Sequence, residues 1–130
     1  MLDFSNSKIL IVGDVMLDKY YFGKVDRISP EAPVPIVNIQ KEESRLGGAS
    51  NVANNIVSLG GHSLLCGVIG HDLFGKEIER ISRHKNIDTF LLKTSSPTIT
   101  KARIIGGKQQ IVRVDYEDKS ELNADNKKLF

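Results

Sequence analysis

The chain has 130 residues, of which 40% are hydrophobic and 26% are charged, a composition typical of one water-soluble globular domain at most. Its 18 basic and 16 acidic side chains leave a net charge of +2, which is too close to neutrality to indicate nucleic acid or a membrane surface as a partner. One cysteine excludes an internal disulfide, no apolar run approaches the roughly 20 residues of a membrane span, and the first residues show no secretory signal. We therefore expect a cytoplasmic protein.

Two apolar runs in the first half of the chain predict buried strands. Residues Lys8–Val12 form a short run rich in β-branched side chains, as in a strand that is covered on both faces. A second run occupies residues 63–69 and contains the single cysteine, Cys66, which we interpret as a small core residue.

Two helical patterns alternate with these strands. Apolar residues over 52–59 recur at helical spacing and stop at Gly60-Gly61, where we expect the helix to end. Asp72 is expected to cap a second helix over 73–84. The order strand, helix, strand, helix predicts a parallel α/β architecture. The inward-facing residues are expected to be Val52, Ala53, Ile56, Val57 and Leu59 in the first helix, and Phe74, Ile78 and Ile81 in the second.

Five further segments predict strands. In the last of them polar and apolar residues partly alternate, as in a sheet with one face in water. Pro35 indicates an edge strand, and Gly106-Gly107 indicates a hairpin. A polar, helix-like segment begins at Lys119. The five strands are expected over residues 20–25, 34–40, 88–93, 98–105 and 110–116.

Two aspartates follow the first predicted strand. Asp14 and Asp18 lie in the segment directly after Gly13, and in open α/β sheets ligands bind outside the carboxyl ends of the strands. A carboxylate can accept hydrogen bonds from two hydroxyl groups, so this pair suits a polyol or a sugar. The alternative is that both side chains accept hydrogen bonds from local backbone N–H groups in a turn.

A glycine pair precedes the first predicted helix. Gly47 and Gly48 lack Cβ atoms and let a ligand approach the backbone, and the N–H groups at the start of a helix favour polar or anionic ligands. Asn51 is expected in the first helical turn, where its amide can both donate to and accept from a hydroxylated ligand. The alternative is a loop that needs flexible residues before a helix.

Three segments together resemble the ribokinase-like (PfkB) family of sugar kinases. They are Gly13–Asp18, the proline-rich Arg27–Val37 and Gly47–Gly61. The Ser-Pro-Glu-Ala-Pro-Val-Pro run within Arg27–Val37 is the most specific part of this resemblance. It resembles the corresponding segment in the branch of the family that phosphorylates a heptose 7-phosphate. The resemblance extends over residues 1–130, but it covers only the amino-terminal part of the family's kinase domain.

The resemblance implies an α/β fold, namely a ribokinase-like three-layer α/β/α arrangement with a β-sheet lid. Residues 1–130 would form only the amino-terminal part of this domain, and the fold would be truncated after that part. The lid strands are expected at about 19–40 and 98–116. Lids of this family often dimerise, so we expect a homo-oligomer formed through the lid sheet or an exposed sheet edge.

The resemblance also implies a binding site for a sugar phosphate. Lys101 and Arg103 alternate along one strand, so both can point toward the same pocket. A phosphate on the sugar needs a cation, and we expect Lys101 or Arg103 to supply it, the alternative being a solvated strand face. Arg113 and Asp115 are expected to pair with each other or with the lid. The residues implied to bind the sugar are Asp14, Asp18, Gly47, Gly48 and Asn51.

The family's catalytic aspartate and nucleotide-binding segments have no counterpart in these residues. Gly70-His71-Asp72 comes too early and lacks the surrounding glycines, so no catalytic residue and no metal ligand is assigned. The complete enzyme is expected to use ATP and Mg²⁺, whereas this fragment is expected to bind neither and to be inactive. The alternatives are another carbohydrate kinase of the family, or a non-catalytic sugar-binding or dimerising module.

Overall fold

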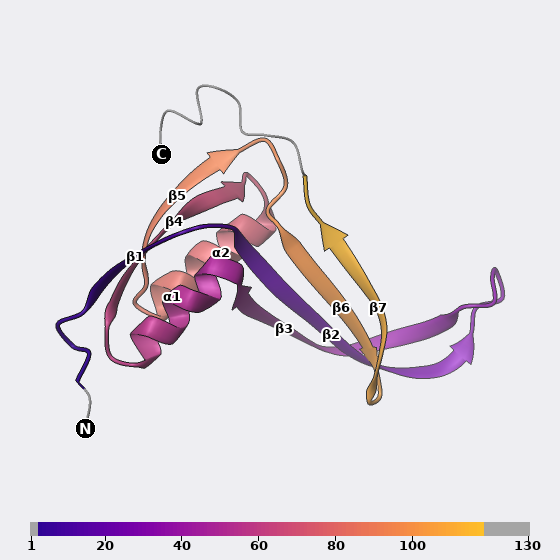
Figure 1. Ribbon diagram of the computed structural model, residues 1–130. Coiled ribbons are helices and arrows are strands. Elements are labelled where there is room, and N and C mark those ends of the chain that lie inside the picture. Colours follow the sequence, from indigo (N-terminus) through magenta and orange to yellow (C-terminus); the bar gives the residue numbers. More distant parts are fainter. Residues whose placement is uncertain (1–2, 119–130) are drawn as a thin grey trace.

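The computed structural model describes residues 3–118, which form two β-sheets and two α-helices (Figure 1). One sheet is parallel with the strand order β1-β4-β5, and the other has the order β3-β2-β6-β7. The helical segment expected from Lys119 lies outside the described residues. Within residues 3–118, no helix is both long and apolar enough to cross a membrane. The elements in chain order are β1 (Lys8–Val12), β2 (Val15–Ile28), β3 (Pro35–Gly47), α1 (Gly48–Ser58), β4 (His62–Gly70), α2 (Leu73–His84), β5 (Asp88–Thr94), β6 (Thr100–Gly106) and β7 (Gln109–Tyr116).

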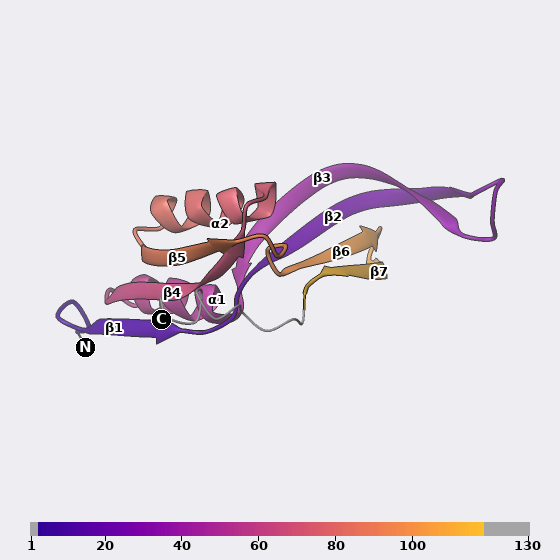
Figure 2. The same ribbon diagram turned by 90° about the horizontal axis from the view of Figure 1, so that it is seen from above.

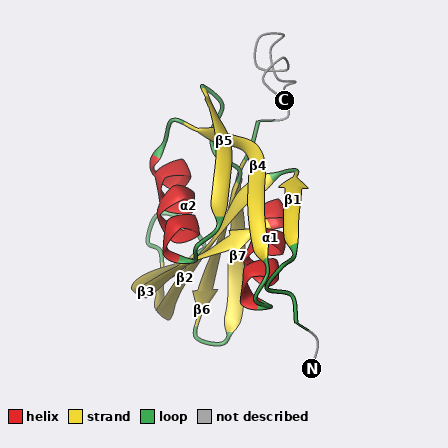
Figure 3. Cartoon of the chain, turned by 90° about the vertical axis from the view of Figure 1, so that its left-hand side faces the viewer, coloured by secondary structure: helices red, strands yellow, loops and turns green. Residues whose placement is uncertain are grey.

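Both helices pack against the same face of the parallel sheet, and Figure 3 views the sheet with the strands in front of α1. Because β4 lies between β1 and β5, both crossovers step in the same direction, and right-handed crossovers then place both helices on one side. The buried core joins Leu65 and Ile69 of β4 to Ala53 of α1 and Ile78 of α2. The predicted parallel α/β arrangement is therefore confirmed.

The opposite face of the parallel sheet is open within the described residues. Leu10 and Val12 of β1 are 61% and 64% exposed, and Phe90 of β5 is 54% exposed. The strands are where the sequence predicted them, but the prediction that Lys8–Val12 and residues 63–69 are buried on both faces is wrong. Burial alternates along β4 because helices cover one side of it only.

The two helices confirm most of the predicted pattern. Asp72 caps α2 by accepting a hydrogen bond from the Gly75 N–H at 2.8 Å. The prediction of an inward-facing side chain is wrong for Val52 of α1 and for Leu59, the residue after α1, which are 48% and 65% exposed. The helix already begins at Gly48, and its buried positions are Ser50 and Ala53, so Val52 falls on the outer side. Phe74, Ile78 and Ile81 of α2 all contact the core.

The second sheet is built on a long two-stranded hairpin that extends away from the helices (Figure 2). β2 pairs antiparallel with β3 and parallel with β6, and β7 pairs antiparallel with β6. The strand predicted over residues 20–25 is the middle of β2, and the one predicted over residues 34–40 corresponds to the first part of β3, which begins one residue later. Pro35 opens the edge strand β3, as expected.

The connection between β1 and β2 is shorter than predicted. Asp18 was expected in a loop, but β2 begins at Val15 and Asp18 lies within it, opposite Arg45 of β3. The Leu17 N–H also donates to the Ile99 carbonyl at 2.9 Å. These tertiary hydrogen bonds turn an expected loop into strand, and they fix the direction of the Asp18 side chain.

Candidate sugar-binding site

Two turns meet where β1 ends and α1 begins. The Asp14 carbonyl accepts a hydrogen bond from the Ala49 N–H at 2.9 Å, and Val15 forms an isolated bridge with Gly48. This contact joins the turn after β1 to the glycine pair before α1, although more than thirty residues separate them in the chain. Asn51 lies in the first turn of α1, as predicted.

The glycine pair is required by close packing against the two aspartates. Gly48 has φ +53°, and a Cβ atom there would stand 2.5 Å from the Asp14 carbonyl oxygen. A Cβ atom on Gly47 would stand 2.6 Å from Oδ2 of Asp18. Both distances are shorter than side chains tolerate, so the glycines allow the aspartates to approach α1.

Asp18 forms an ion pair with Arg103 across the sheet. The Arg103 guanidinium donates from Nη1 to Oδ1 of Asp18 at 2.6 Å, and each side chain is about one-fifth exposed. This hydrogen bond from Arg103 to the Asp18 carboxylate raises the pKa of the guanidinium, although partial burial opposes the shift. The pair holds the carboxylate in place on the face of the sheet.

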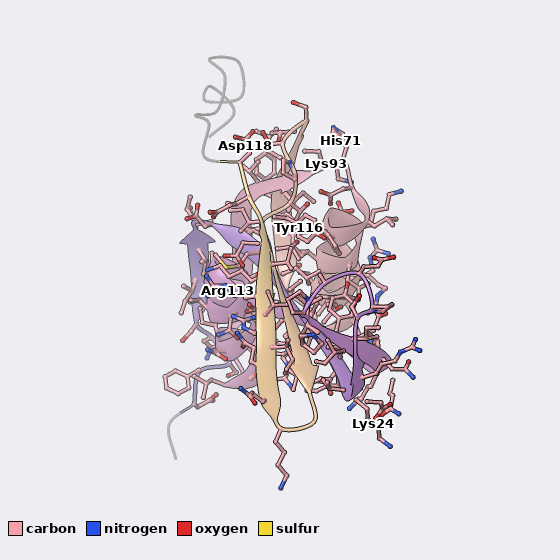
Figure 4. All side chains as sticks on the ribbon, turned by 90° about the vertical axis from the view of Figure 1, so that its right-hand side faces the viewer. Lys24, His71, Lys93, Arg113, Tyr116 and Asp118 are labelled. Carbon is pink, nitrogen blue, oxygen red and sulfur yellow. The ribbon has the colours of Figure 1, made fainter. Side chains whose placement is uncertain are left out.

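That face carries most of the polar residues predicted to bind the sugar. Residues directly opposite each other on paired strands share a face. Asp18 lies opposite Lys101 of β6, and Tyr20 lies opposite Arg103, so the two basic side chains occupy one face as predicted. On β7, which runs along the front of Figure 4, the Arg113 Nε donates to Oδ1 of Asp115 at 2.9 Å. This ion pair confirms the pairing expected for these two residues.

A cavity of about 420 Å³ lies where this face meets the helices. Asp18 and Asn51 both line it, so the structure brings together the carboxylate and the amide predicted to contact a sugar. Their oxygen and nitrogen atoms offer acceptors and a donor to a polyol. The full lining is Asp18, Tyr20, Ser44, Arg45, Leu46, Asn51, Asn54, Ile81 and Lys85.

Asp14 does not share this cavity. It lines a separate hollow of about 230 Å³ between the end of β1 and Ile99, so the two aspartates predicted to bind one sugar line different cavities in the described residues. Gly47, Gly48, Lys101 and Arg103 are not among the cavity's lining residues either. Gly47 packs against the Asp18 carboxylate and Gly48 against the Asp14 carbonyl. The two basic residues flank Asp18.

A second polar cluster anchors the strand that carries the basic residues. Asp72 accepts hydrogen bonds from the Thr98 N–H and hydroxyl at 2.8 and 2.7 Å, and the Thr98 hydroxyl accepts one from the Gly70 N–H at 2.8 Å. Burial acts to raise the pKa of the Asp72 carboxyl, but the donors of Thr98 and Gly75 outweigh it and hold the pKa below its usual range. This cluster ties the start of α2 to the segment leading into β6.

Five polar residues of the cavity were missed by the sequence analysis, namely Tyr20, Ser44, Arg45, Asn54 and Lys85. Tyr20 and Arg45 lie next to predicted residues, and the alternation of β2 and β3 was the signal that could have placed them on the Asp18 face. Lys85 follows α2 in the chain, and no local pattern connects it with the site. Among the described residues, no group of three His, Cys, Asp or Glu side chains can hold a metal ion.

Known proteins with similar sequences include one named as a heptose 7-phosphate kinase and several named HldE. The D-beta-D-heptose 7-phosphate kinase of Bordetella bronchiseptica is 50% identical over 121 residues, which are 92% of this chain and 39% of that protein. The bifunctional protein HldE of Helicobacter pylori strain P12 is 53% identical over 123 residues, which are 93% of this chain and 27% of that protein. The chain thus spans between about a quarter and two-fifths of the length of the curated relatives it matches.

The fold and the family agree with these relatives. The ribokinase of Giardia lamblia has a similar fold, with a TM-score of 0.62 and 20% sequence identity, over 85% of this chain and 36% of that one. This likeness shows the ribokinase-like fold predicted from the sequence, of which the chain forms a part. Residues 6–130 match the family described as pfkB family carbohydrate kinase. Because this match covers nearly the whole chain, the protein belongs to the pfkB family of carbohydrate kinases.

Proposed function

We propose that this chain is the acceptor-binding part of an ATP-dependent kinase for D-glycero-β-D-manno-heptose 7-phosphate. The kinase would phosphorylate the anomeric hydroxyl and give the 1,7-bisphosphate, a precursor of ADP-heptose for the lipopolysaccharide core. About half of the residues are identical to those of relatives named as heptose 7-phosphate kinase or HldE. The cavity that joins Asp18 to Asn51 is the single structural observation that carries the proposal.

The acceptor sugar would bind on the polar face of the four-stranded sheet, which acts as the lid of the site. Asp18 would accept hydrogen bonds from sugar hydroxyls, and Asn51 would donate to and accept from others. Gly47 allows this carboxylate to sit close to the start of α1, and Gly48 leaves room for the Asp14 carbonyl. Asp14 would contribute from its own hollow at the end of β1.

Lys101 and Arg103 would place positive charge beside the 7-phosphate. Both lie on the face that carries Asp18, and a guanidinium matches phosphate oxygens with two hydrogen bonds. Arg103 already donates to Asp18, so a phosphate that it contacts is held close to the carboxylate that binds the sugar hydroxyls.

ATP and Mg²⁺ would bind outside the described residues. Those residues contain no cluster of potential metal ligands, and the sequence contains no glycine-rich phosphate loop of the P-loop or dinucleotide-binding type. The cavity suits the sugar, because its hydroxyl groups need the hydrogen-bond donors and acceptors that line the cavity. ATP would supply the phosphoryl group, and the catalytic base would come from beyond this chain, so the 130 residues alone would be inactive.

An ATP-consumption assay tests the proposal. The complete protein encoded with these residues would be offered heptose 7-phosphate, fructose 6-phosphate, ribose and unphosphorylated heptose. We expect turnover with heptose 7-phosphate to exceed that with each other sugar. Preference for fructose or ribose substrates would reject this substrate and support another carbohydrate kinase of the family.

Calorimetry on the 130-residue chain tests the role of the fragment. We expect binding of heptose 7-phosphate without ATP turnover. If the complete encoded protein also binds the sugar phosphate without turnover, the protein is a sugar-binding module rather than a kinase.

We also place the protein in the cytoplasm, where ATP is available, as a homo-oligomer. The edge strand β7 is exposed along its whole length and carries Val112, Val114 and Tyr116, each at least 40% exposed. An unpaired strand with apolar side chains favours pairing with a second copy. Light scattering should give a mass above that of one chain, and a strictly monomeric mass at high concentration would contradict this assembly.

A further inference from the structure

Two guanidinium groups lie against one aromatic ring on the polar face of the sheet. The guanidinium carbon of Arg45 is 4.8 Å from the centroid of the Tyr20 ring, and that of Arg103 is 5.2 Å from it. Cations at such distances are attracted to the ring face. Tyr20 therefore holds a basic residue of β3 and a basic residue of β6 on either side of the strand that carries Asp18.

The two arginines differ in what occupies their hydrogen-bond donors. Arg103 is committed to Asp18 at 2.6 Å. Arg45 donates to Glu43 at 2.7 Å, but its side chain is 61% exposed, and Glu43 also pairs with Lys41 at 2.6 Å. If Arg45 turned toward a ligand, Glu43 would keep a cationic partner. An exposed ion pair of this kind contributes little to stability, so exchanging it for a ligand costs little.

Arg45 lines the same cavity as Asp18 and Asn51, whereas Arg103 does not. Its place follows from strand register, because Arg45 lies directly opposite Asp18 on β3. Lys85, at the end of α2, lines the cavity from the helical side. Among the described residues no carboxylate forms an ion pair with the Lys85 ammonium group. The cavity therefore combines side chains that can hydrogen-bond to sugar hydroxyls, namely Asp18, Asn51 and Asn54, with the two cations Arg45 and Lys85.

We propose that Arg45, assisted by Lys85, binds the phosphate group of the acceptor and makes the site selective for phosphorylated over free sugars. This proposal deepens the proposed function and rests on it. Arg45 offers the planar pair of donors that matches phosphate oxygens, and its stacking on Tyr20 orients that pair. Lys85 adds a single mobile charge. Arg45 acts on the β3 side of Asp18, while Lys101 and Arg103 lie on the β6 side.

Calorimetry with two ligands tests the proposal in the complete encoded protein. Heptose 7-phosphate and unphosphorylated heptose would be titrated into the wild-type protein, Arg45→Gln and Lys85→Gln. We expect Arg45→Gln to weaken binding of the phosphorylated sugar roughly tenfold to 100-fold, as for the loss of a charge-assisted hydrogen-bonded pair. Binding of free heptose should stay within about twofold, and Lys85→Gln should give a smaller loss of the same kind.

Matched controls separate recognition from folding and from overall charge. Lys24→Gln removes one exposed cation of β2 that does not line the cavity, at the periphery of the sheet in Figure 4, and should leave both affinities unchanged. Arg45→Lys keeps the charge but not the paired donors, and should restore part of the lost affinity. Circular dichroism would establish that each variant is folded.

Three outcomes would overturn the proposal. Equal weakening of both ligands by Arg45→Gln, or no weakening of either, would exclude Arg45 as the phosphate ligand. If the wild-type protein still phosphorylated heptose 7-phosphate, the proposed function would stand. Equal affinity of the wild-type protein for the two sugars would contradict this proposal. Failure of the wild-type protein to phosphorylate heptose 7-phosphate would contradict the proposed function as well.

Discussion

The two sheets of this molecule use their faces in opposite ways. The parallel sheet buries one face beneath α1 and α2 and leaves the other, with Leu10 and Val12, open. The four-stranded sheet carries charge on one face, where Asp18 and Arg103 form an ion pair and Arg45 stacks on Tyr20. The first sheet holds the fold together, and the second supplies the groups that can bind a ligand.

This difference separates stability from recognition within one chain. The core joins the buried face of β4 to the two helices, so substitutions there should act on folding. The charges of the polar face range from the exposed Arg45 to the Asp18–Arg103 pair, which is about one-fifth exposed. Pairs that water reaches contribute little to stability, so substitutions there should act mainly on binding. Paired substitutions on the two sheets can therefore distinguish an effect on folding from an effect on binding.

Truncation of one side chain on each face of the parallel sheet gives the sharpest contrast. Leu65 is fully buried beneath the helices, and Leu65→Ala should lower the free energy of unfolding by about 2–5 kcal/mol through cavity formation. Leu10→Ala, on the open face, should cost less than about 1 kcal/mol in the 130-residue chain. Urea denaturation measures both. Equal losses would show that the open face is as well packed as the covered one.

Asp18→Asn should separate binding from stability. The loss of one charged acceptor should weaken sugar phosphate binding by about 1.5–3 kcal/mol, while the free energy of unfolding should change by less than about 1 kcal/mol because the ion pair is partly exposed. Glu79→Gln breaks the Lys93 pair, which lies between α2 and β5, and should leave binding unchanged. Calorimetry and thermal unfolding provide the two readouts, and unchanged binding in Asp18→Asn would contradict the site.

Gly47→Ala should disturb both properties. The added methyl group would stand 2.6 Å from the Asp18 carboxylate and 2.9 Å from the Met16 side chain, so we expect a loss of about 1–3 kcal/mol in stability from overpacking together with weaker sugar binding. Gly60→Ala is the control, because no atom lies within 4 Å of the added group there. Its positive φ gives strain, but sugar binding should be retained.

The Asp72 cluster predicts a smaller, pH-dependent effect. The folded-state pKa of Asp72 is lowered, so its contribution to stability is fully present above the unfolded-state value of about 3.9 and is lost as the pH falls through the folded-state value. Asp72→Asn should flatten the acid limb of stability against pH below about pH 4. Asp88→Asn, at an exposed position of β5, serves as a control. Identical acid limbs in wild type and Asp72→Asn would show that the cluster does not stabilise the fold.

Local patterns in the sequence predicted the strands, the second helix and its cap. Apolar runs and helical spacing depend on neighbouring residues, and they placed β1, β4 and α2 correctly. The resemblance of Gly13–Asp18 and Gly47–Gly61 to sugar kinases led to the family that the comparisons show. The shared face of Lys101 and Arg103 also followed from simple alternation along a strand.

Only the tertiary structure decided which faces are covered and which polar groups meet. Both crossovers step in one direction, so both helices fall on one side of the sheet, and no local pattern could show that Val12 stays exposed. Strand register likewise brought Arg45 opposite Asp18, and Lys85 joined the cavity from a separate helix. The sequence alone determined the elements and the family because those depend on short-range spacing, whereas the cavity depends on contacts between residues far apart in the chain.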